Sequence, residues 1–413
     1  MPIRNHNAPW GLFFLNPFLL MLVSIRYNKA RWAPNALWAF VVFFGLTFAI
    51  GEENQGSDIH RYLDLLEYFY LHINYVDEAY TYFINSGQLD VIQYVIAYLV
   101  SRLTDSQPVL TVVYAFIFGY FYSRNIFYLF RQLKGHLPPW TWLLVTIFML
   151  IVPFWNINGF RFWTATHVYV FGLLPYLLEG RKRSLWLCGL SVFIHFTYLL
   201  PVLVLLGYHI LPKRIFIALS AFLFTFIYRE VDPQWLNTIL AQYAPAIFID
   251  RTDSYLSAEQ IEQYRSTTRT VQWYAIWYGR VLNYAISFLL VLIAIKFRTR
   301  IQTIVHLRRL LFFTFIFYSI ANLASSVPSG GRFISTAMLL GIFFITLFYQ
   351  NYYRGSLSKY WLPILTPAFA LFIIVSIRIG FYFISVSTLL SNPIVAIFTA
   401  GETSSMNDLI KNF

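Results

Sequence analysis

The sequence has 413 residues, of which 58 % are hydrophobic and 20 % aromatic, whereas only 12 % are charged. A soluble domain carries about a quarter charged residues, so this composition excludes a disordered chain or a coiled coil and argues against a soluble enzyme. The 30 Lys and Arg exceed the 18 Asp and Glu, which gives a net charge of +12. Most basic residues lie in short loops between apolar runs, which is typical of a membrane protein rather than of a nucleic-acid-binding surface.

Apolar runs of bilayer-spanning length recur along the whole chain. They lie near residues 10–25, 35–50, 89–103, 108–130, 140–156, 160–178, 184–210, 215–228, 272–295, 309–326, 333–350 and 360–380. The pattern predicts an all-α, polytopic membrane protein with about 11–13 membrane segments, built as a single integral membrane domain over residues 1–413. The first run has no small-residue cleavage site after it and is expected to stay as an outside-to-inside anchor.

The acidic residues lie mainly in two stretches. Eight of the 18 carboxylates fall between Glu52 and Asp90, and six more fall between Glu230 and Glu262. They predict two outer loops at 51–88 and 229–271, the first with an amphipathic helix at Tyr62–Tyr82. By the positive-inside rule the basic clusters mark the cytoplasmic side. These clusters are Arg26/Lys29/Arg31, Arg131/Lys134, Arg181/Lys182/Arg183, Lys213/Arg214, Lys296/Arg298/Arg300/Arg308/Arg309 and Arg354/Lys359.

Runs 89–103 and 184–210 do not fit a simple alternation across the membrane. The outer loop at 51–88 and the inner loop at Arg131 lie on opposite sides, yet two runs, 89–103 and 108–130, separate them. Run 89–103 is therefore predicted to lie at the interface or to insert only partly. Run 184–210 has basic residues on both flanks. It is predicted to be a re-entrant hairpin that turns near His195, with its non-helical backbone surrounded by protein or by a wet cavity.

Five arginines fall on the outer side, against the charge rule: Arg61, Arg161, Arg280, Arg332 and Arg378. An ionisable residue within a membrane span costs roughly 2.5–3.5 kcal/mol at the centre and is a functional-site hypothesis. Arg161 and Arg332 follow Gly-containing turns that open helices, and both a helix N-terminus and a guanidinium bind anions. Arg280 lies about two turns below the outer end of its span. We expect Arg161, Arg280 and Arg332 to converge on one polyanion, such as a pyrophosphate, that offsets their mutual repulsion.

The other candidate residues each have a structural alternative. Arg61 could be an ordinary loop charge, and Arg378 could extend to the interface. His195 could be a neutral histidine bonded to a neighbouring helix, or a phosphate donor or proton-transfer group. Asp58 could be the N-cap of the following helix, or a carboxylate that orients Arg61 or an acceptor hydroxyl. The aromatic residues of Tyr62–Tyr82 suit either an interfacial belt or a sugar-binding platform.

Three motifs together resemble the EpsG / Wzy-like family of polysaccharide-repeat polymerases. They are Gly56-Ser57-Asp58-x-x-x-Tyr62, Gly159-Phe160-Arg161-x-x-Thr164-Ala165 and His195-Phe196-Thr197-x-Leu199, and a Gly331-Arg332-Phe333 turn follows as a weaker fourth. The resemblance implies a GT-C-like membrane glycosyltransferase of the bacterial inner membrane with its active site facing the periplasm. Such an enzyme joins undecaprenyl-pyrophosphate-linked oligosaccharide repeats and needs no metal or other cofactor. Its expected partners are membrane lipid and a chain-length regulator protein, but no nucleic acid.

The resemblance and the charge pattern together assign roles to single residues. Arg161, Arg280 and Arg332 would hold the pyrophosphate. Asp58 or His195 would orient or deprotonate the acceptor hydroxyl. Secondary contacts to the acceptor would come from Arg61, Tyr62 and Arg378. Two other functions stay open, a flippase or transporter of lipid-linked oligosaccharides and an O-antigen ligase, although the sequence shows no pseudo-symmetric halves of the kind common in transporters.

Overall fold

The computed structural model describes residues 9–51, 58–87, 89–228, 238, 242, 272–327, 329–401 and 404–412. The second predicted outer loop, 229–271, therefore lies outside the described residues except for two positions. The described chain is helical throughout and forms no β-strand, only two isolated bridges, Phe48 with Ile384 and Ser385 with Ser405. The predicted all-α class is confirmed.

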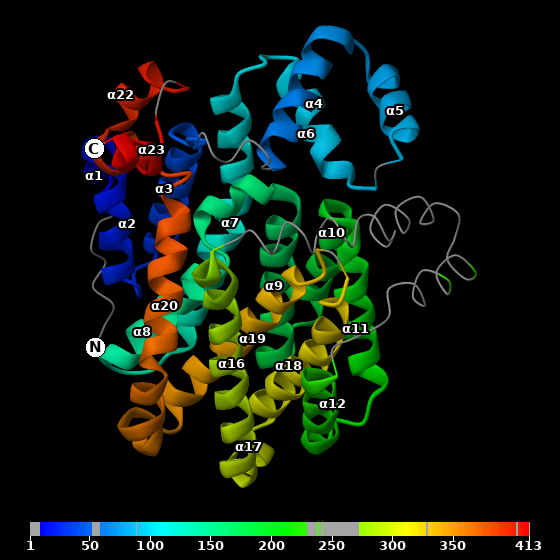
Figure 1. Ribbon diagram of the computed structural model, residues 1–413, viewed down its shortest axis with the longest axis vertical. Helices are drawn as coiled ribbons and strands as arrows, with labels where there is room; N and C mark the ends of the chain where they lie inside the picture. The colour runs from blue at the N-terminus through cyan, green and yellow to red at the C-terminus, as the bar shows by residue number, and fades with distance from the viewer. Residues whose placement is uncertain are drawn as a thin grey trace.

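The helices run in chain order through the bundle of Figure 1. They are α1 (Gly11–Leu15), α2 (Pro17–Arg26), α3 (Ala33–Leu46), α4 (Asp58–His72), α5 (Val76–Asn85), α6 (Val91–Ser101), α7 (Gln107–Gln132), α8 (Pro139–Ile151), α9 (Phe160–Glu179), α10 (Leu185–Ile194), α11 (Leu199–Ile210), α12 (Ile215–Ile227), α16 (Trp273–Lys296), α17 (Arg298–Thr303), α18 (Val305–Ala324), α19 (Arg332–Asn351), α20 (Leu362–Gly380), α21 (Val386–Leu390), α22 (Pro393–Phe398) and α23 (Met406–Asn412).

Six helical stretches of the described chain are long and apolar enough to cross a membrane: Gln107–Gln132, Pro139–Glu179, Trp273–Lys296, Val305–Ala324, Arg332–Asn351 and Leu357–Gly380. Five shorter apolar helices accompany them, among them α2, α3 and α12. The protein is a multi-pass membrane protein. The stretch Pro139–Glu179 is two helices, because α8 ends at Ile151 and a 3₁₀ turn at Phe154–Gly159 leads back into α9. The apolar run predicted at 140–156 is therefore shorter than expected.

The basic clusters predicted to be cytoplasmic come together at one end of the bundle, which we call the basic end. Lys29 donates hydrogen bonds to the carbonyls of Phe130 and Leu133, the second at 2.7 Å. Arg354 donates to the carbonyl of His136 at 3.3 Å, and Arg300 donates to the carbonyl of Tyr352 at 2.7 Å. Segments far apart in the sequence therefore share one charge sign at one end. That this end faces the cytoplasm stays a prediction of the charge rule.

At the opposite end, α4, α5 and α6 form a small cap over the bundle (Figure 1). The predicted amphipathic helix at Tyr62–Tyr82 is wrong as one continuous element, because the chain breaks at Ile73–Tyr75 between α4 and α5. The Glu78 carboxylate stabilises this break by accepting hydrogen bonds from the amides of Asn74 (2.7 Å) and Tyr75 (3.1 Å). Helix α6 has 11 residues, too few to cross a bilayer, as was predicted for run 89–103.

The predicted reversal near His195 is confirmed. Helix α10 ends at His195, which has an extended backbone, and α11 then runs back along α9. Tyr169 of α9 touches both limbs: its hydroxyl donates to the carbonyl of Pro201 at 2.8 Å, and its own carbonyl accepts from the Cys188 thiol at 3.6 Å. With 10 and 12 residues, neither limb is long enough to span a membrane.

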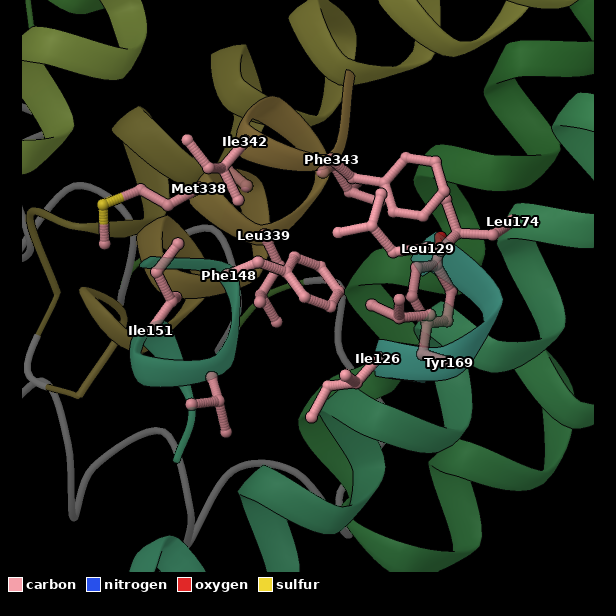
Figure 2. Close-up of a cluster of buried hydrophobic side chains, with 14 of the residues drawn as sticks. Ile126, Leu129, Phe148, Ile151, Tyr169, Leu174, Met338, Leu339, Ile342 and Phe343 are labelled. Carbon is pink, nitrogen blue, oxygen red and sulfur yellow. The ribbon is translucent and has the colours of Figure 1, made fainter. Parts of the chain in front are cut away.

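A close-packed apolar core lies below the cap, where α7, α8, α9 and α19 meet (Figure 2). Its members are Ile126, Leu129, Phe148, Ile151, Tyr169, Leu174, Met338, Leu339, Ile342 and Phe343. Gly45 lets α3 approach α7 closely, since a Cβ there would lie 2.5 Å from the Cβ of Ala115. This core holds α8, α9 and α19 together, and the candidate site is built from the ends of these helices nearest the cap.

Candidate functional site

Asp58 lies between two of the predicted arginines at the cap end of the bundle. It opens α4, and its carboxylate oxygens lie 3.0 Å from Arg61 Nη2 and 3.7 Å from Arg332 Nη2. The Arg61 side chain is 70 % exposed and that of Arg332 is 39 % exposed. Surface ion pairs of this kind add little stability, so these guanidiniums are available to another anion.

A second, buried ionic group lies beside the first and centres on Asp90, which sequence reasoning did not select. Arg161 Nη1 donates to Asp90 Oδ2 at 2.9 Å, and His195 Nδ1 donates to Asp90 Oδ1 at 3.0 Å. The amide of Phe196 adds a hydrogen bond of 2.8 Å to Oδ1. Only 3 % of the Asp90 side chain is exposed, against 20 % for Arg161. Asp90 therefore ties the cap to the tips of α9 and the α10–α11 hairpin.

Tyr62 completes the buried group from the cap side. Its hydroxyl accepts a hydrogen bond from Arg161 Nε at 3.3 Å, and the guanidinium carbon of Arg161 lies 5.5 Å from the centre of its ring. Burial raises the pKa of Tyr62 in spite of the nearby Arg161 charge, so the phenol stays neutral. Burial by itself would raise the pKa of Asp90, but its hydrogen bond from His195 and the charges of His195 and Arg161 hold that pKa below its usual range.

Glycine-containing turns bring the two helix starts into this site. A Cβ on Gly159 would lie only 2.8 Å from the Trp163 ring, so residue 159 needs to lack a side chain for this ring to pack against it. The same position lies 3.8 Å from Asp58 Oδ2, an ordinary contact distance that places the start of α9 beside the carboxylate. Before α19, a Cβ on Gly330 would lie 1.9 Å from the carbonyl oxygen of Ala324. The neighbouring Ser329 has a φ of 63°, which is an unusual backbone conformation for a residue with a side chain. This turn places Arg332 at the first position of α19, as the sequence predicted.

Arg332 also lines a partly open cavity of about 450 Å³ between α8, α9, α16, α19 and α20. The polar lining consists of Arg332, Asn156, Ser329, Ser335 and Ser376, and the aromatic lining consists of Trp155, Trp163, Tyr278 and Phe372. Ile151 and Met338 line the cavity as well and also belong to the apolar core of Figure 2. The cavity lining thus combines one cation, Arg332, with apolar and aromatic side chains. Such a lining suits an amphiphile with an anionic head.

The structure brings together Asp58, Arg61, Tyr62, Arg161, His195 and Arg332 but leaves two predicted residues apart. Arg280 is exposed, and its guanidinium carbon lies 5.8 Å from the ring of Trp277. The Arg378 guanidinium lies 4.8 Å from the ring of Tyr274. Each is the chain neighbour of a cavity-lining residue, Gly279 and Ile379 respectively. Neither arginine lines the cavity or joins the Asp58 cluster, because each guanidinium packs over an aromatic ring of α16 instead.

Phe162 lies between Arg332, which lines the cavity, and the buried group of Asp90, Arg161 and His195. The Arg332 guanidinium carbon lies 5.7 Å from the centre of its ring, and the His195 ring packs edge-on against it at 5.5 Å. The Asp90 carboxylate accepts a hydrogen bond from His195 Nδ1 and so fixes the orientation of the imidazole ring.

No family model matches the chain, and neither does any curated protein or solved structure. The resemblance to the polymerase family therefore rests on the four motifs alone.

Proposed function

We propose that the protein is a bacterial inner-membrane polymerase that joins undecaprenyl-pyrophosphate-linked oligosaccharide repeats on the periplasmic face. The observation that carries this proposal is the convergence of Arg61, Arg161 and Arg332 with Asp58 beside an amphiphilic cavity, at the end of the bundle away from the basic loops. A lipid-linked pyrophosphate has the anionic head and the apolar tail that such a cavity suits.

In the proposed reaction, an acceptor hydroxyl attacks the anomeric carbon of the donor glycan. The new glycosidic bond forms as the bond between that carbon and the pyrophosphate oxygen breaks, and the electron pair leaves with the pyrophosphate. Arg332 at the cavity wall stabilises the growing negative charge, which is a large part of catalysis in charge-separating reactions. Arg161 adds a positive charge from the neighbouring Asp90 group. Arg280 and Arg378 lie one residue from the cavity-lining Gly279 and Ile379 along the chain and are proposed as more distant cations.

Asp58 is the proposed acceptor of the hydroxyl proton. At 3.7 Å its contact with Arg332 is loose, so a pyrophosphate that binds Arg332 can replace the carboxylate there. The Asp58 oxygen released from Arg332 then lies next to the reacting groups as a general base, while Arg61 still holds the other oxygen at 3.0 Å. His195 is held by Asp90 on its Nδ1 side, so we assign it to positioning of the neighbouring Arg161–Asp90 pair.

The proposal is tested with purified full-length protein and a defined lipid-linked repeat, by measuring the chain length of the product. Replacing Arg332 with Ala should lower the rate of chain extension about 100-fold or more, the usual loss for one donor of charge stabilisation. A matched control is Arg131→Ala, an exposed arginine at the end of α7 on the basic side, which should extend chains normally.

Two outcomes would contradict the proposal. Long chains of normal length from the Arg332→Ala protein would remove Arg332 from the pyrophosphate site. Wild-type protein that moves lipid-linked repeats across vesicles without lengthening them would be a transporter and not a polymerase.

A further inference from the structure

The net charge of the protein comes from one part of the chain. Residues 263–401 contain 12 Lys and Arg and no Asp or Glu. The 18 Lys and Arg outside this stretch match the 18 Asp and Glu of the whole chain, so the stretch accounts for the entire net charge of +12. Where its loops meet at the basic end, the cations have no acidic neighbour in their own sequence.

Five exposed side chains form what we call the inner basic surface: Lys134, Lys296, Arg300, Arg354 and Lys359. Three of them are held in place by uncharged partners. Lys296 Nζ donates to Ser356 Oγ at 3.2 Å, while Arg300 and Arg354 donate to backbone carbonyls. None of the five forms an ion pair with a carboxylate of the described residues. The positions of these three side chains are fixed by their hydrogen bonds, and no carboxylate of the described residues neutralises any of the five charges.

Lys134 belongs to the same surface through the loop after α7. Its amide donates to the side chain of Asn351 at 2.9 Å, and Gln350 donates to the carbonyl of His136 at 3.0 Å. These bonds hold the loop against the end of α19, beside Arg354. The surface therefore combines loops that follow α7, α16 and α19.

Exposed apolar side chains continue from this surface along the same helices. Ile295 precedes Lys296 on α16, and Tyr360 follows Lys359 on the π-helical turn Leu357–Trp361 that leads into α20. Both are exposed, as is Ile364 one turn further on. The ring centroids of Phe288 on α16 and of Trp361 lie 5.3 Å apart. The exposed apolar side chains of α16 and those at the start of α20, which we call the two apolar strips, therefore lie side by side. π-helical turns are rare and are frequently found at functional sites.

We infer that the inner basic surface binds the phosphodiester headgroup of an anionic phospholipid of the adjoining leaflet. A soluble polyanion would need only the charges, whereas a lipid also uses the exposed apolar strips of α16 and α20 for its acyl chains. Basic pockets between membrane helices on the cytoplasmic side are a recurrent form of lipid recognition. The inference does not depend on the proposed polymerase activity.

The test uses the full-length protein in phosphatidylcholine nanodiscs with and without phosphatidylglycerol, and measures lipid retention by native mass spectrometry. Wild-type protein should retain phosphatidylglycerol about tenfold or more over phosphatidylcholine, because several Lys and Arg each attract the anionic headgroup. The variant Lys296→Gln/Arg300→Gln/Arg354→Gln/Lys359→Gln should lose this preference, while Lys296→Arg/Arg300→Lys/Arg354→Lys/Lys359→Arg should keep most of it and shows that the surface still folds.

The matched control removes four exposed charges from the same end but outside the surface: Arg26→Gln/Arg31→Gln/Lys182→Gln/Arg183→Gln. It should retain phosphatidylglycerol like the wild type. An equal loss in this control would mean that net charge, and not this surface, attracts the lipid. Displacement of phosphatidylglycerol by soluble glycerophosphate would point to a site for a free anion, and either result would overturn the inference.

Discussion

At the scale of single residues, the site depends on a carboxylate that has no direct contact with the cavity lining. Asp90 accepts hydrogen bonds from Arg161, from His195 and from the amide of Phe196. Its removal would leave Arg161 without a carboxylate partner, with only the Tyr62 hydroxyl at 3.3 Å, and breaking a buried pair in this way commonly costs about 3–5 kcal/mol. The orientation of Arg161, and through it the electrostatic field of the site, is therefore set by Asp90.

Asp90 should also give the protein an acid-sensitive component of stability. Its pKa in the folded protein lies below its usual range, so the folded state binds a proton there less readily than the unfolded state. The stabilisation is complete above the unfolded pKa of about 4 and is lost as the pH falls towards the folded pKa. Thermal unfolding in detergent should show the wild type losing stability in this window.

The variant Asp90→Asn should unfold at a lower temperature at neutral pH and depend less on pH in the acid range. Asp64→Asn is the matched control, because Asp64 is exposed on α4. This substitution should not change how the unfolding temperature depends on pH. If the unfolding temperatures of the wild type and of Asp90→Asn change with pH in parallel, the carboxylate charge of Asp90 does not stabilise the fold.

At the scale of helices, the sequence predicted where most elements lie but not the contacts between them. The starts of α9 and α19 at their glycine turns and the reversal at His195 follow from local signals, namely Gly residues, charge flanks and apolar length. The break at Ile73–Tyr75 does not, because the amphipathic pattern continues through it. Asp90 was not selected because its partners are 71 and 105 residues away, and no periodicity indicates a contact over that distance.

Packing between α3 and α7 supports a prediction at this scale. A Cβ on Gly45 would lie 2.5 Å from the Ala115 Cβ and 2.6 Å from the carbonyl oxygen of Thr111. The variant Gly45→Ala should therefore force the two helices apart and destabilise the protein by about 1–3 kcal/mol. Gly207→Ala on α11 has open space around its Cβ and should have no effect or stabilise slightly, by up to about 1 kcal/mol.

Unfolding temperatures of the two alanine variants in the same detergent distinguish packing from helix propensity. If Gly45→Ala is as stable as Gly207→Ala, then α3 and α7 are not in the close contact described here.

At the scale of the whole molecule, the direction of each helix between the two ends defines a topology. The described start and end of the chain both lie at the end with the candidate site, since Asn16 Nδ2 donates to the carbonyl of Leu389 at 2.9 Å and Ser405 pairs with Ser385. Helix α3 leads to the same end, where the Gly51 amide donates to the carbonyl of Tyr382 at 3.0 Å. The α10–α11 hairpin starts and ends on the other side.

Fusions of alkaline phosphatase, which is active only outside the cytoplasm, test this topology. If the basic end is cytoplasmic, fusions after Asn85 and after Lys411 should be active. Fusions after Arg183 and after Arg214 should both be inactive, because the hairpin between them returns to the side from which it started. A spanning helix at 184–210 would instead make one of these two active. Activity after Arg214 alone would therefore disprove the hairpin, whereas a complete inversion of all four results would keep the fold and reverse its orientation in the membrane.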